Sequence, residues 1–341
     1  MQDKLENLNS VDIAKLVAAL FVVSIHMNPL EPGRANDLII GIFARLAVPF
    51  FYLTSSYLFF SRSDIGISNL KHYVKRLLIL YAFWFVVNIP IMYIARVHGG
   101  EHTSSVQILL VLLRDFFLSN TYDGSYFVIS LIECVPLVYF MSKYMKDMWL
   151  LVIGLLLFSF VSVCLDYYVY LPQSLSEIFR RCGNADFDLA CTFLTAYIYV
   201  VMGKILARHK AAIFLNRRRV FCIMLVSLAL YYSESLGFPF RIPRLPLSRI
   251  LASVAVFASV LNVRISTTLP YKHIRRMSTI IFFSHFIFVF FVWRYYYHIT
   301  EVLKFGNHSR YLLVLSLSIL TFFCINFLSG RKYTTWLKYS Y

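Results

Sequence analysis

The run VDIAKLVAALFVVSIHMNPL, which covers Val11 to Leu30, decides the fold class of this protein. It is apolar over the roughly 20 residues that an α-helix needs to cross about 30 Å of hydrocarbon. No small-residue cleavage site accompanies it, and similar runs follow it throughout the chain. We therefore interpret the run as a permanent transmembrane helix and not as a secretory signal.

The recurrence of such runs predicts an all-α, polytopic membrane helix bundle with about ten transmembrane helices. Backbone polar groups in lipid must be satisfied within their own segment, which a helix achieves and an open strand does not. The composition agrees, because 15% of the 341 residues are charged and a soluble domain has about 25%. We predict a single domain over residues 1–341, with a core of about 9–330. The predicted helices are 11–30, 38–60, 75–96, 124–143, 148–168, 188–207, 219–236, 248–264, 275–294 and 311–329.

The joints between these helices predict the orientation. When alternate joints are assigned to opposite sides, most Lys and Arg residues collect on one side, which the positive-inside rule makes cytoplasmic. Both termini are therefore predicted to be cytoplasmic, in a bacterial plasma membrane. Topology and membrane lipid thus account for the net charge of +16, and no nucleic acid partner is predicted. Five arginines oppose this assignment by falling on the outer side: Arg180, Arg181, Arg241, Arg244 and Arg249.

The outer joints are the longer ones and are rich in tyrosine, with Tyr126 among them. Aromatic rings at this depth usually form an interfacial belt, and stacking against a sugar is the alternative. The first of these joints contains a short apolar stretch, residues 104–118, with Arg114 and Asp115 inside it. This stretch is predicted to be an interfacial or re-entrant helix.

Lys15 and His26 are ionisable residues within the first helix. A charged side chain at the centre of a span costs about 2.5–3.5 kcal/mol, so it marks a site or a paired structural contact. Their separation of 11 residues is almost three helical turns, or about 16 Å along one face. Lys15 then lies near the cytoplasm and His26 nearer the outer surface. A coenzyme A thioester has the same polarity, with phosphates at one end and the acyl carbon at the other. A core histidine satisfied by a carbonyl is the alternative for His26.

Arg45 in the second helix is predicted to lie level with His26. Pro49 follows it and leaves backbone groups without their helical hydrogen bonds, which membrane helices often accept where a cavity is built. A cation here would stabilise the oxyanion of an attacked thioester, whereas the alternative is an arginine that extends to the outer headgroups. Glu133 in the fourth helix either orients His26, pairs with Arg45 or forms a helix–helix hydrogen bond. His285 in the ninth helix is the remaining intramembrane candidate.

These residues resemble those of a known family, the membrane-bound acyltransferases called acyltransferase 3. The opening NSVDIAKLVAALFVVSIHMNP is similar to the family's first helix, in which an acidic residue, a basic residue and a histidine recur; here these are Asp12, Lys15 and His26. Weaker similarities in HYVKRLLILYAFW, GSYFVISLIECVPLVYF and STIIFFSHFIFV extend the resemblance over about residues 9–295. The run FARLAVPFFYLTSSYLFF resembles the second motif through Arg45, Val48, Pro49, Phe50, Phe51, Ser55 and Tyr57.

The sequence departs from the family pattern at several positions. Tyr73 stands where the family commonly has the first of two arginines, with Arg76 at the second. Ser56 replaces the usual glycine after Ser55, and Ser125 replaces a tryptophan before Tyr126. Lysine at position 15, where arginine is common, keeps the charge but loses the fork of donors that fits phosphate.

The resemblance implies transfer of an acetyl or similar group from cytoplasmic acyl coenzyme A to a hydroxyl of a cell-surface polysaccharide or lipid-linked sugar. His26 would be the general base or a transient acyl carrier, Arg45 would stabilise the developing charge, and Glu133 completes the catalytic set. The donor is assigned to Lys15, Lys75 and Arg76, and the acceptor to Ser55, Tyr126 and His285. No metal is implied, because the histidines show no ligand spacing.

Two other functions compete with this one. An exporter of surface polysaccharide, or another transporter on the same fold, would also use intramembrane His, Arg and Glu residues. Such proteins often have inverted repeats, and the absence of a visible repeat here favours the enzyme. A sensor or a membrane anchor for a partner enzyme is the third possibility.

Overall fold

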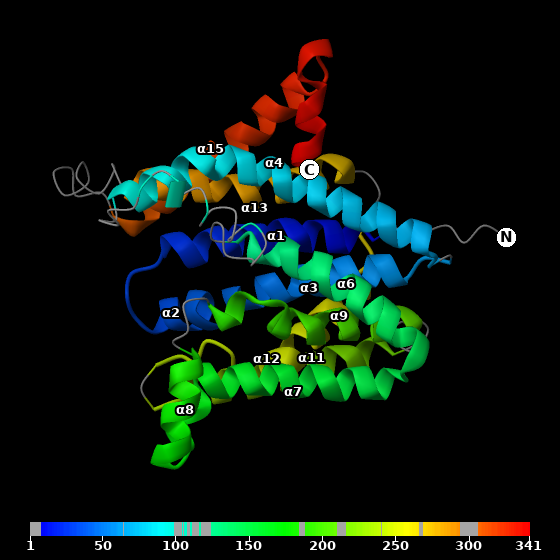
Figure 1. Ribbon diagram of the computed structural model, residues 1–341, viewed down its shortest axis with the longest axis vertical. Coiled ribbons are helices and arrows are strands. Elements are labelled where there is room, and N and C mark those ends of the chain that lie inside the picture. Colours follow the sequence, from blue (N-terminus) through cyan, green and yellow to red (C-terminus); the bar gives the residue numbers. More distant parts are fainter. Residues whose placement is uncertain are drawn as a thin grey trace.

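The computed structural model (Figure 1) is a bundle in which most of the long helices lie side by side with their axes roughly parallel. It describes residues 8–63, 65–98, 104, 106, 107, 110, 116, 124–183, 188–209, 216–239, 241–265, 269–293 and 306–341. Within these ranges nine helices are long and apolar enough to cross a membrane, which confirms the all-α polytopic class. Most of the predicted interfacial stretch 104–118 lies outside the described residues.

The helices follow the predicted order along the chain. In the first half, α1 is Asn9–Met27, α3 is Ala47–Phe60, α4 is Ile67–His98, α6 is Tyr126–Tyr144 and α7 is Asp147–Leu165. In the second half, α9 is Phe193–Arg208, α11 is Arg217–Leu236, α12 is Arg249–Leu261, α13 is Tyr271–Phe291 and α15 is Asn307–Leu328. Short helical turns flank them: η3 (Tyr167–Tyr170), η4 (Leu189–Cys191) and the C-terminal η6 (Lys332–Ser340).

Two segments differ from the prediction. The expected span 248–264 is α12, which has only 13 residues and is therefore about 20 Å long, too short to cross the hydrocarbon alone. It begins at Arg249, after a turn in which the N–H of Arg249 donates to the carbonyl of Pro246 at 3.1 Å, and it ends at Leu261. The expected joint 169–187 contains a further helix, α8 (Gln173–Gly183), which stands across one end of the bundle (Figure 1).

The second membrane span is irregular in its first half. It opens with α2 (Arg34–Asn36), continues as the π-helical turn η1 (Asp37–Ile42) and the 3-10 turn η2 (Phe43–Leu46), and becomes α-helical only at Ala47. Pro49 explains part of this, because it has no N–H to give to the carbonyl of Arg45, four residues earlier. Irregular backbone in a membrane is tolerated where it lines a cavity, which is the situation here.

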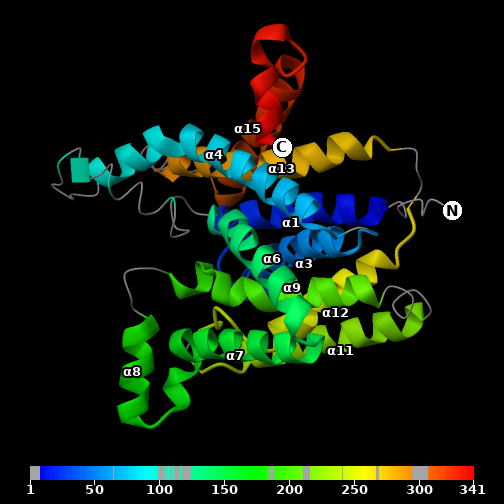
Figure 2. The same cartoon turned by 45° about the vertical axis from the view of Figure 1, so that its right-hand side comes forward.

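The helices form layers around a central pair. Figures 1 and 2 show α1 and α3 in the middle, α4, α13 and α15 on one side, and α7, α9, α11 and α12 on the other. The most extensive contacts join α3 to α9 and α1 to α13. The close approach of α3 and α9 rests on small residues, because Gly203 of α9 faces Ser56 of α3.

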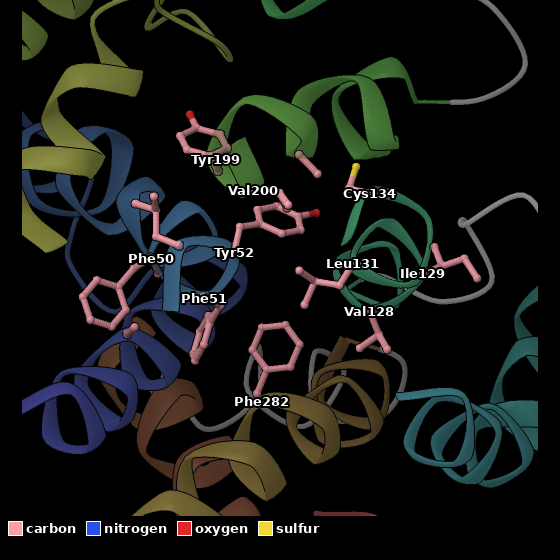
Figure 3. Close-up of a cluster of buried hydrophobic side chains, with 14 of the residues drawn as sticks. Phe50, Phe51, Tyr52, Val128, Ile129, Leu131, Cys134, Tyr199, Val200 and Phe282 are labelled. Carbon is pink, nitrogen blue, oxygen red and sulfur yellow. The ribbon is translucent and has the colours of Figure 1, made fainter. Parts of the chain in front are cut away.

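Aromatic side chains fill the centre of the bundle (Figure 3). Phe51 of α3 meets Phe282 of α13 edge to face, with 5.2 Å between ring centroids. Tyr52, on the next position of α3, stacks on Tyr199 of α9 at 6.3 Å. Leu131 of α6 closes the cluster from a third direction. This packing fixes α3 against three neighbours and so positions the irregular turn that precedes it.

Candidate active site

A cavity of about 330 Å³ lies at the end of the bundle that the charge pattern predicts to be outer. Helix α1 contributes His26 to it, η2 contributes Arg45, and the start of α12 contributes Arg249. Aromatic residues form much of the remaining wall: Tyr52, Tyr126, Tyr199, Phe282 and Phe286. A partly enclosed cavity with mainly apolar and aromatic walls and a few convergent ionisable groups is the usual form of a small-molecule site.

His26 lies in the last turn of α1 and is half-buried. Its ring contacts Phe286 edge to face at 4.7 Å and lies 5.5 Å from the ring of His285, both centroid distances. His285 is completely buried, and its Nδ1 bonds to the carbonyl of Ile281 at 3.1 Å. Because a carbonyl only accepts, that nitrogen carries the proton and Nε2 is left as an acceptor. Nε2 is buried without a partner among the described residues.

Arg45 connects η2 to the outer loop. Its Nη1 donates to the carbonyl of Pro243 at 2.8 Å. The carbonyl of Arg45, which Pro49 leaves without a helical donor, accepts a hydrogen bond from Nη2 of Arg249. The proline in the second motif therefore creates the acceptor that holds Arg249 at the cavity.

Arg244, Arg249 and Asp188 are site residues that the sequence reasoning did not assign. Arg244 donates to Asp188 at 2.5 Å, and Asp188 also accepts from the backbone N–H of Ala190 at 3.1 Å. Burial lowers the pKa of Arg244, but the hydrogen bond and the charge of Asp188 outweigh it and raise this pKa above its ordinary value. The sequence did set these two arginines apart. Arg244 and Arg249 fall on the predicted outer side, whereas most Lys and Arg residues fall on the predicted cytoplasmic side.

A second group of charges lies at the other end of α1. Arg275 of α13 forms a forked ion pair with Asp12, with Nε at 3.0 Å and Nη2 at 2.7 Å from the carboxylate oxygens. The charges of Asp12, Arg275 and Arg76 all act on Lys15, so the four groups lie near one another. Lys15 and Arg76, two of the residues predicted to hold the donor, thus lie near each other, and Arg275 is a neighbour that was not predicted. Lys15 does not line the cavity that holds His26.

The other predicted site residues are placed differently. Glu133 is exposed on α6 and does not line the cavity, so the expected contact with His26 or Arg45 is not formed. The reason is helical phase: Leu131, Cys134, Val135 and Val138 form the inward stripe, and Glu133 falls outside it.

Two predicted residues on or beside α4 also lie away from the cavity. The hydroxyl of Ser55 bonds to the hydroxyl of Tyr73 at 2.8 Å, so Ser55 joins α3 to α4 and does not face the cavity. Tyr73 occupies the position at which the family has an arginine, and this bond gives it a structural role. Lys75 is exposed on α4.

Fold and site together define a multi-pass membrane protein with a histidine-bearing cavity at one end of its helix bundle and a cluster of cations at the other. The family model described as an acyltransferase domain matches residues 8–328, so the chain belongs to the acyltransferase 3 family.

Two proteins from Enterococcus faecalis named amino-acid racemase are similar to this chain. One is 26% identical over 241 residues, which is 65% of this chain and 32% of the relative. The other is 26% identical over 135 residues, which is 37% of this chain and 18% of the relative. The chain thus spans a third or less of the length of these relatives. No solved structure matches it significantly.

Proposed function

We propose that the protein transfers an acyl group from cytoplasmic acyl coenzyme A to a hydroxyl of a cell-surface polysaccharide or lipid-linked sugar, in a bacterial plasma membrane. One observation carries the proposal. His26 and Arg45 line one cavity, and α1, the helix that carries His26, bears Lys15 towards its opposite end. The rise from Lys15 to His26 is about 16 Å, which suits a donor with phosphates at one end and a thioester at the other.

His26 acts as the general base on the acceptor hydroxyl. As the proton moves to the imidazole, the hydroxyl oxygen attacks the thioester carbonyl carbon and a C–O bond forms. Arg45 stabilises the oxyanion that develops on the carbonyl oxygen. The C–S bond then breaks, and the leaving thiolate takes the proton from the imidazolium. An acyl-histidine intermediate would divide the same changes between two steps.

The donor is held by the cations at the cytoplasmic end of α1. The proposal is supported by the charges near Lys15, because Arg76 and Arg275 both act on it and Arg275 pairs with the carboxylate of Asp12. Among the described residues, three cations against one carboxylate leave an excess of positive charge, which favours the phosphates of coenzyme A. The ion pair with Asp12 anchors Arg275 and keeps it from moving freely. Arg275 therefore orients this group of cations.

The test compares O-acyl groups on surface glycans, measured by NMR, in cells with the protein, without it, with His26→Ala and with His308→Ala. His308 is an exposed histidine at the start of α15 and is the matched control. We expect the acyl signals to disappear without the protein and with His26→Ala, and to persist with His308→Ala. Purified protein in vesicles should release coenzyme A only when acyl coenzyme A is on the side of Lys15. Identical glycan profiles in all four strains would overturn the proposal in favour of transport.

A further inference from the structure

The cavity that contains His26 has an excess of positive charge. Among the described residues that line it are the guanidinium groups of Arg45, Arg244 and Arg249, against the single carboxylate of Asp188. Asp188 is already committed to Arg244, at 2.5 Å. The described side chains therefore leave two guanidinium charges in the cavity without a carboxylate partner.

Within the described part of the chain, the side chains of Arg45 and Arg249 donate hydrogen bonds to backbone carbonyls alone. Arg45 donates to the carbonyl of Pro243, and Arg249 donates to the carbonyls of Arg45 and, at 3.2 Å, Arg244. The charges of Arg249 and Arg244 also act on Arg45, so the cations repel one another. A charge away from water is costly unless it is paired, and ionisable residues in a membrane protein are normally paired or functional.

Further hydrogen-bonding capacity surrounds these two charges. Nε of Arg249 is buried and has no partner among the described residues. The hydroxyls of Tyr52 and Tyr199 are also buried without a described partner, and the two side chains are 3% and 2% exposed. Both tyrosines line the cavity. Unsatisfied buried donors of this kind cost about 1–3 kcal/mol each, which a suitable ligand would recover.

We propose that the acceptor is anionic, and that Arg249 binds its carboxylate or phosphate group beside the reacting hydroxyl. This inference rests on the proposed function and narrows the acceptor to acidic sugars or sugar phosphates. Arg45, held next to Arg249 through its own carbonyl, remains free to stabilise the oxyanion. Arg244 contributes less, because Asp188 already neutralises it. Two donors of a planar guanidinium fit a carboxylate or phosphate in a bidentate arrangement, which a lysine does not reproduce.

The test is equilibrium binding to the full-length protein in lipid nanodiscs, with methyl glucuronide, glucose 6-phosphate and the neutral methyl glucoside as probes. We expect both anionic probes to bind at least about tenfold more tightly than the neutral one, since hydrogen bonds to charged groups contribute about 1.5–3 kcal/mol. The tighter of the two anionic probes identifies carboxylate or phosphate. Arg249→Gln should remove the preference, and Arg249→Lys should retain part of it.

Two further variants keep the proposal falsifiable if Arg249→Gln does not fold. Asp188→Asn retains an oxygen for the Ala190 N–H but frees Arg244, so it should tighten anion binding several-fold. Arg241→Gln is the matched control. Arg241 lies in the same loop as Arg244, before α12, but it pairs with Asp166 and does not line the cavity. It should leave the anion preference unchanged.

Equal binding of the neutral and anionic probes by the unmodified protein would overturn the proposal. An Arg249→Gln variant that keeps the preference for anionic probes would also overturn it. So would an Arg249→Gln variant that loses acetyl coenzyme A binding while glucuronide binding is intact, because Arg249 would then bind the anionic groups of the donor. Binding is measured without turnover. A protein that prefers the anionic probes but transfers no acyl group therefore refutes the proposed function and leaves the anion site standing.

Discussion

Gly203→Ala tests the contact that holds α9 against α3. A methyl group at this position would lie 1.9 Å from Oγ and 3.0 Å from Cβ of Ser56, and 3.0 Å from the carbonyl oxygen of Leu53. Ser56 is completely buried, and its hydroxyl donates to the carbonyls of Tyr52 at 2.8 Å and Leu53 at 3.1 Å. Rotating the hydroxyl relieves only the first clash, because Cβ of Ser56 and the backbone of Leu53 stay close. The two helices must therefore separate.

Overpacking of this kind costs about 1–3 kcal/mol, so Gly203→Ala should destabilise the protein by that amount. Ser56→Gly removes the two atoms of Ser56 that clash, and it restores the residue that the family usually has at this position. Alone it should cost about 0.5–1 kcal/mol, as glycine does within a helix. The double variant should be more stable than the sum of the single effects predicts, by about 1 kcal/mol or more.

The assay is reversible unfolding in mixed micelles, followed by far-UV circular dichroism, for the two single variants and the double variant. Gly306→Ala is the control, because nothing lies within 4 Å of an added methyl group there. A Gly203→Ala protein as stable as the unmodified one would refute the reasoning. Strict additivity of the two changes would refute it as well, since the helices would then not meet at this pair.

Three further outcomes are expected. Asp147→Asn should cost about 2 kcal/mol of unfolding free energy, because Lys204 is buried and bonds to Asp147 at 2.6 Å. Lys204→Met removes the buried charge itself and should therefore cost less. A larger loss of stability for Lys204→Met than for Asp147→Asn would contradict this reasoning. Glu234→Gln should expose the loop 237–248 to limited proteolysis, because Glu234 accepts from the N–H groups of Leu247 at 2.9 Å and Ser248 at 2.8 Å. In steady-state transfer assays, Arg275→Gln should raise the KM for acyl coenzyme A about tenfold with little change in kcat, whereas Glu133→Gln should leave both constants within about twofold.

The helices and their order could be predicted from the sequence because each is decided locally. A run of about 20 apolar residues has no alternative to a helix in lipid, whatever its neighbours are. The predicted runs accordingly appear as helices, with most ends shifted by a few residues, although α4 begins eight residues earlier than predicted, at Ile67. The exception in length is α12, which has 13 residues because it ends at Leu261, before the predicted end at residue 264.

The placement of His26 and Arg45 in one cavity could also be anticipated from helical rise, since both lie a few residues from the same end of adjacent spans. The orientation of Glu133 could not be read in this way. An intramembrane carboxyl is conspicuous in a sequence, but the side of α6 that faces the bundle depends on how α3, α4 and α9 pack against it. That packing turns Glu133 away from the cavity.

By itself, the sequence determined that this chain crosses the membrane repeatedly and that one helix carries a cation and an imidazole on a common face, since both follow from length and periodicity within a single segment. Only the tertiary structure decided which distant residues join them. Arg249 reaches the cavity because Pro49 leaves a carbonyl free 204 residues away, at Arg45, and Arg275 reaches the opposite end through Asp12. Such pairings depend on contacts between segments that no local pattern encodes.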